Sequence, residues 1–70
     1  MSKLPPTKRE DEILIYVYGY INDNNFSPTR KEIAGKFEMS VAAADYFIKK
    51  LVEKEKLKLT AGKWRNIAIK

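Results

Sequence analysis

The chain has 70 residues, with 14 Lys and Arg against 9 Asp and Glu, and it contains no Cys and no His. This length holds one small domain, and the missing residue types exclude disulfides, tetrahedral zinc sites and Ser–His or Cys–His nucleophiles. We therefore expect no enzymatic activity, cofactor, metal site or small-molecule substrate. The longest apolar run, residues 13–21, is too short to cross a bilayer, and no signal peptide precedes it, so a cytoplasmic protein without membrane contact is expected.

The positive charge is concentrated in the last third of the chain. Residues 1–48 carry six basic and seven acidic groups, a net charge of −1, whereas residues 49–70 carry eight basic and two acidic groups, a net charge of +6. Such asymmetry favours a polyanionic partner, either nucleic acid or an acidic membrane surface. A solvated surface that keeps a small protein soluble is the alternative.

The first predicted helix follows a short arm. The prolines at positions 5 and 6 predict a flexible arm over residues 1–6, and Thr7 with Glu10 has the spacing of a capping box. A helix from Lys8 to about Asn22 follows; a buried strand over residues 13–18 is the alternative, but length and the cap favour the helix. Ile15 lies off its wide apolar face, as a surface side chain or as part of a self-association patch. That face comprises Ile13, Leu14, Tyr16, Val17, Tyr18, Tyr20 and Ile21.

Two further helices are predicted after the turn at residues 23–28. Thr29 and Glu32 form a second capping box, which predicts a helix over residues 30–37. Ser40 caps a third helix from Val41 to about Lys54. Its apolar stripe has helical period and comprises Val41, Ala44, Phe47, Ile48, Leu51 and Val52.

A two-stranded hairpin is predicted for the C-terminal residues, because the apolar period changes to two at Leu57 and Leu59. Residues 61–63 form the turn, and the chain returns over residues 64–69. Trp64 either packs on its own strands or supports a binding surface, depending on a bulge at Gly62. The predicted fold class is mainly α with a small β-hairpin: a winged helix-turn-helix domain over residues 7–70, with three helices and a two-stranded wing.

The segment Ser27-Pro28-Thr29-Arg30-Lys31-Glu32-Ile33-Ala34 resembles the Pro-Pro-Thr-Arg-x-Glu-Ile-Ala segment of the LexA repressor family's DNA-binding domain. Residues 8–14 with 20–21, 42–45 and 51–54 are similar to other segments of that domain, so the resemblance covers residues 7–69. It implies a DNA-binding transcriptional regulator of prokaryotic, phage or plasmid origin.

Departures from the family pattern fall on the third helix. Ala42 stands where the family has Asn, and Asp45 and Tyr46 stand where it has paired glutamates. The turn over residues 37–40 is one residue shorter than in the family. The family's self-cleaving domain, with its Ser–Lys dyad, has no counterpart in these 70 residues, so a protein of this length would not be inactivated by that route.

The winged layout predicts which residues meet double-stranded DNA. The recognition helix, residues 41–54, would enter the major groove, and the basic wing, residues 56–69, would follow the backbone or the minor groove. Because Arg, Asn and Gln are missing from the base-facing set, direct readout should be modest, with Tyr46 and Lys50 as its main side chains; Tyr46 lying over the helix surface is the alternative. The base-facing candidates are Ser40, Ala42, Ala43, Tyr46 and Lys50, with Lys49 beside them on the outer face.

Phosphate contacts are predicted at two further places. Thr29, Arg30 and Lys31 begin the second helix, where N–H groups and the helix dipole favour an anion, although capping and solvation also explain them. The wing candidates are Lys56, Lys58, Lys63 and Arg65. A module this small usually needs a homodimer on two half-sites. The alternative function is a winged-helix protein–protein module, such as an anti-repressor or an assembly subunit, favoured by the Ala-rich third helix and Ile15.

Overall fold

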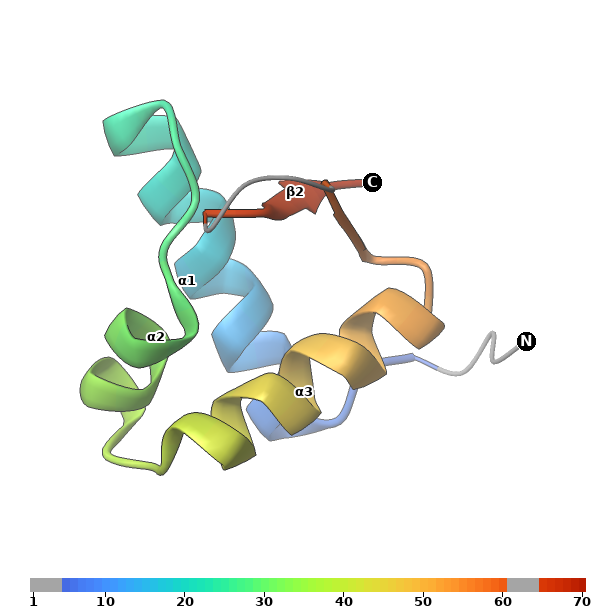
Figure 1. Ribbon diagram of the computed structural model, residues 1–70. Coiled ribbons are helices and arrows are strands. Elements are labelled where there is room, and N and C mark those ends of the chain that lie inside the picture. The colour runs from blue at the N-terminus through green and yellow to red at the C-terminus, as the bar shows by residue number, and fades with distance from the viewer. Residues whose placement is uncertain (1–4, 61–64) are drawn as a thin grey trace.

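The computed structural model describes residues 5–60 and 65–70, and within them three helices precede a two-stranded antiparallel sheet (Figure 1). The order confirms the predicted fold class. In chain order the elements are α1 (Lys8–Asn24), α2 (Arg30–Phe37), α3 (Val41–Glu53), β1 (Leu57–Leu59) and β2 (Ile67–Ile69).

Local capping explains where the helices begin. The Thr7 hydroxyl accepts from the Glu10 N–H at 3.3 Å, and the Glu10 carboxylate accepts from the Thr7 N–H at 3.0 Å. Thr29 and Glu32 make the same reciprocal pair at 3.1 and 2.8 Å. Both predicted capping boxes are therefore present. Helix α1 runs past its predicted end at residue 22, because the chain turns into the left-handed conformation only at Asn25.

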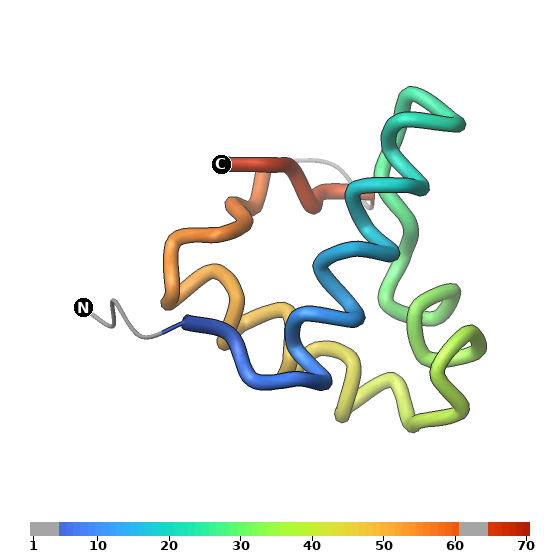
Figure 2. The backbone as a smooth tube through the Cα atoms, turned by 180° about the vertical axis from the view of Figure 1, so that it is seen from behind, coloured from blue at the N-terminus to red at the C-terminus, as the bar shows by residue number. Residues whose placement is uncertain are grey.

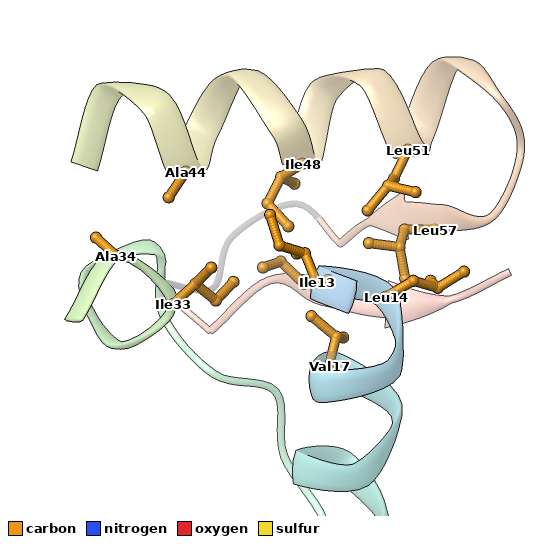
Figure 3. Packing of buried hydrophobic residues seen from close by; sticks show 10 residues of the cluster. Ile13, Leu14, Val17, Ile33, Ala34, Ala44, Ile48, Leu51 and Leu57 are labelled. Carbon is orange, nitrogen blue, oxygen red and sulfur yellow. The ribbon is translucent and has the colours of Figure 1, made fainter. Parts of the chain in front are cut away.

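The core lies where α3 crosses α1 and α2 and meets β1. Ala44, Ile48 and Leu51 point from α3 into this space (Figure 3). Seen from behind, α1 passes in front of α3 (Figure 2). The fully buried large aliphatic side chains come from four elements and comprise Ile13, Val17, Ile33, Ile48, Leu51 and Leu57. These contacts fix α3 on the scaffold and leave its opposite face open to solvent.

Four side chains assigned to apolar faces are more exposed than predicted. Val41 is 50% exposed and Tyr18 is 43% exposed, and Leu59 and Ile69 of the hairpin are also exposed. A periodicity projection assumes that neighbouring elements cover the whole length of a helix or strand. In a domain this small the covering stops short of Val41, Leu59 and Ile69, which begin or end their elements, and it leaves the Tyr18 side of α1 open. The prediction was wrong at these positions.

The hairpin is shorter than predicted. Leu57 pairs with Ile69 and Leu59 pairs with Ile67, so β2 begins at Ile67 and not at residue 64. Of the four, Leu57 and Ile67 are the buried members. The predicted turn at residues 61–63, the bulge at Gly62, Trp64 and residues 1–4 of the predicted arm lie outside the described residues. None of the described helices is both long and apolar enough to cross a membrane.

Candidate nucleic-acid interface

The outer face of α3 presents the residues predicted to meet DNA bases. Ala42, Tyr46 and Lys49 are exposed, while Ala43 and Lys50 are partly buried. Ser40 is exposed but serves as the N-cap, its hydroxyl accepting from the Ala43 N–H at 3.0 Å. All of them therefore lie on or beside one helix face.

 

Several polar groups of this face already bond within the protein. The engaged polar groups are the Ser40 hydroxyl, the Asp45 carboxylate and the Lys49 and Lys50 amines, the last bonded to Glu53 at 3.4 Å. The exposed Tyr46 ring packs edge-on against Phe47, with centroids 5.4 Å apart. The face thus combines apolar surface at its N-terminal end with paired lysines further along.

Asp45 organises the charges of this face. Its Oδ1 accepts from Arg30 Nε at 3.0 Å, and its Oδ2 lies 3.0 Å from Lys49 Nζ. Hydrogen bonds from Lys49 and then from Arg30 hold the pKa of Asp45 below its ordinary value, so the carboxylate is charged at neutral pH. It therefore holds one cation from α2 and one from α3.

Arg30 joins three elements. Besides Asp45 of α3, it reaches the residue before β2, where its Nη1 donates to Asn66 Oδ1 at 2.7 Å. Its side chain is 21% exposed. The beginning of α2 is thereby tied to both α3 and the wing, which gives Arg30 a positioning role beside the predicted phosphate contact. Thr29 next to it is the N-cap of α2, and Lys31 is exposed.

Arg65 lies against the helices and not on the outer face of the wing, where it was predicted. Its Nη1 and Nη2 donate to the two carboxylate oxygens of Glu32 at 2.9 and 3.1 Å, and Nη1 also donates to the Ser27 carbonyl at 2.8 Å. Its guanidinium stacks 4.6 Å from the Phe26 ring centroid. The prediction placed it by strand alternation, but Arg65 precedes β2, and the planar guanidinium is matched by a carboxylate. A DNA contact by Arg65 stays a prediction.

The pairing of Arg65 has an electrostatic consequence for its partner. Hydrogen bonds from Arg65, followed by the Thr29 N–H, lower the pKa of Glu32 to about 2. The same carboxylate thus caps α2 and holds the start of the wing.

On the wing, Lys56 and Lys58 are exposed, as their alternation with Leu57 predicts. Lys63 lies outside the described residues. Exposed lysines therefore lie on α3, just before β1 and on β1, and clustered Lys and Arg are the electrostatic footprint of a nucleic-acid partner.

Two residues that organise this face were not predicted to do so. Asp45 stands four residues before Lys49, a spacing that favours an ion pair on a helix and could have indicated its role. Asn66 bonds to a residue 36 positions away, and no local pattern announces such a contact.

The model of the LexA DNA binding domain family matches residues 1–66 of the chain. The chain belongs to this family. Membership in the LexA DNA binding domain family makes it a DNA-binding domain, in agreement with the resemblance carried by residues 27–34.

Full-length relatives agree with the LexA assignment. The chain is 40% identical over 70 residues to LexA repressor 1 of Pseudomonas putida and to LexA repressor 1 of Pseudomonas syringae pv. tomato, and 39% identical to the LexA repressor of Pseudomonas aeruginosa. Each match covers 99% of this chain, and 34%, 34% and 33% of the respective relative. The chain thus spans about a third of the length of these curated relatives.

Proposed function

We propose that the chain binds double-stranded DNA as the winged helix-turn-helix module of a transcriptional regulator. Helix α3 enters the major groove, and the wing follows the backbone or the minor groove. The observation that carries this proposal is the exposure of Lys49 on α3, of Lys56 just before β1 and of Lys58 on β1. The family and the repressors named above support it.

The roles of the side chains follow from their surroundings. Tyr46 and Lys50 face the bases, and the lysines of α3 and the wing neutralise phosphates. Lys31 and the N–H groups at the start of α2 approach the backbone. Arg30 and Arg65 act by fixing the wing to α2, so that α3 and the wing meet the duplex with one geometry.

Selection of bound sites from random duplex DNA tests the proposal. A specific binder enriches one family of sites, and a gel shift with mixed genomic DNA gives the weaker non-specific affinity. With about six phosphate contacts, the slope of log K against log salt should be near −5. An affinity that does not change between low and moderate salt would contradict the electrostatic part of the proposal.

We further propose that two copies bind two half-sites, because one module of this size buries little DNA surface. Size-exclusion chromatography with light scattering, with and without the selected duplex, measures the stoichiometry. A duplex with two half-sites should carry two copies. A single copy at every protein-to-DNA ratio would rule out the dimer.

A protein–protein module is the second candidate, favoured by Ile15, which is 63% exposed on α1. Tyr18, one turn further along, is 43% exposed. The two candidates separate in the gel shift. If no duplex is shifted even at low salt, the protein-binding function is supported and the DNA-binding function fails.

A further inference from the structure

The base-facing end of α3 exposes a continuous apolar surface. Val41 is 50% exposed and Tyr46 is 56% exposed. Ala42, also exposed, lies between them around the helix axis, because successive residues turn by 100°. These three side chains form the first two turns of the open face and are here called the apolar tip.

Polar groups beside the apolar tip are already used within the protein. The Ser40 hydroxyl accepts from the Ala43 N–H, and both carboxylate oxygens of Asp45 are paired with cations. Helix α3 also contains no Arg, Asn or Gln, the residues that make bidentate contacts with purines. What remains accessible at this end is therefore mainly apolar.

We propose that the apolar tip reads the C5-methyl groups of thymine in the major groove. This inference rests on the proposed DNA binding and deepens it, since it names the base feature that the helix recognises. The thymine methyl is the apolar group that distinguishes base pairs in this groove. Val41 and Tyr46 supply two separate contact points, so the preferred half-site contains thymines below the first two turns of α3.

Replacement of single thymines by deoxyuridine in the selected duplex tests the inference, because uracil lacks only the methyl group. At each thymine that the apolar tip contacts, the affinity should fall about fourfold, the value expected for burial of one methyl carbon. Deoxyuridine at the remaining thymines should leave the affinity unchanged.

Protein variants then assign each methyl to a side chain. In Val41→Ala, the loss caused by deoxyuridine at the matching position should shrink to less than about twofold, because the two changes remove the same contact. Val41→Thr replaces one of the two methyl groups of the side chain by a hydroxyl, so it should also shrink this loss, and it serves where the alanine variant does not fold. Tyr46→Phe keeps the ring and should retain the methyl effect. Ile15→Ala removes an exposed apolar side chain of α1, outside both α3 and the wing, and should leave the methyl effects unchanged.

Three results would overturn the inference. If every deoxyuridine duplex binds as tightly as the thymine duplex, the apolar tip reads no methyl group, although DNA binding itself stands. If the losses are the same in Val41→Ala and Tyr46→Ala as in the unchanged protein, the methyl groups are read elsewhere. If no duplex binds at low salt, the proposed function fails and the inference fails with it.

Discussion

Glu10 and Lys54 form a buried ion pair that joins the first turn of α1 to the end of α3. The Lys54 Nζ lies 2.6 Å from the Glu10 Oε1, and the side chains are 8% and 4% exposed. Burial by itself would raise the pKa of Glu10, but the hydrogen bonds from Lys54 and from the Thr7 N–H, with the charge of Lys54, outweigh it and lower the pKa. The Glu10 carboxylate is therefore charged in the folded protein at neutral pH.

Removal of the lysine charge should destabilise the fold. Lys54→Met leaves a buried carboxylate without its cation, and the free energy of unfolding should fall by about 3 kcal/mol. Chemical denaturation measures this loss. Lys56→Met, at an exposed lysine two residues later, is the matched control and should have an effect within about 0.5 kcal/mol. Equal stability of the two variants would show that the pair contributes little.

Glu32 makes stability depend on pH. Its pKa of about 2 in the folded protein lies below its ordinary value near 4.5. The contribution of the charged Glu32 to the free energy of unfolding is therefore complete above about pH 4.5 and is lost as the pH falls toward 2. Glu32→Gln keeps a side chain suited to the capping box but removes the titrating charge. The slope of unfolding free energy against pH over this range should be smaller in this variant. Glu38→Gln, at an exposed glutamate, is the control; a slope unchanged by Glu32→Gln would contradict the assignment.

The contrast between these residues explains how much the sequence could predict. Both ends of α2 and both capping boxes were predicted correctly, because their signals lie within a few residues of one another. Lys54 was counted among the basic groups of residues 49–70, because no local pattern reveals a partner, Glu10, that is 44 positions away in the sequence. Arg65 was misplaced for the same reason, as Glu32 is 33 positions away. Periodicity predicted the exposed face of α3 but not Val41, where covering by neighbouring elements decides exposure.

At the scale of elements, the wing and α3 should divide the work of binding. Lys56 and Lys58 lie on or beside β1 and are exposed, and the phosphate contacts proposed for them should be independent of sequence. In the proposed complex the side chains of α3 meet base edges, and changes there should alter the preference among sites. The connection from Arg30 to Asn66 holds the two elements in register.

Lys58→Ala should weaken binding to specific and non-specific duplexes by the same factor. The slope of log K against log salt should become less steep by about 0.9, the contribution of one phosphate contact. Fluorescence anisotropy at several salt concentrations measures both quantities. Lys58→Arg keeps the charge and should preserve the slope. A change in the ranking of sequences in Lys58→Ala would instead indicate base readout by the wing.

At the scale of the whole molecule, charge is separated along the chain: residues 49–70 carry a net charge of +6 and residues 1–48 a net charge of −1. A polyanion attracts the basic part and orients the protein before contact, which raises the association rate constant at low salt. The positions of the charges should therefore affect the association rate constant more than the net charge does.

Two single-charge variants separate these effects. Lys58→Gln lowers the net charge by one on the wing, and Asp11→Asn raises it by one on α1, where Asp11 is exposed. Stopped-flow mixing with labelled duplex at low salt measures the association rate constant. Lys58→Gln should lower this rate constant by a larger factor than Asp11→Asn raises it. Changes of equal size and opposite sign would mean that only the total charge steers the encounter.

Pro5 and the pair of β1 and β2 lie beside the C-terminal end of α3, which has a consequence for how a further domain could be joined. Lys54, which follows α3, donates to the Pro5 carbonyl at 3.3 Å, and Ile69 pairs with Leu57 nearby (Figure 2). With 13 residues, α3 separates this region from Val41 by about 18 Å. A linker continuing from Lys70 would thus depart at the far end of the recognition helix and leave its groove-facing turns unobstructed.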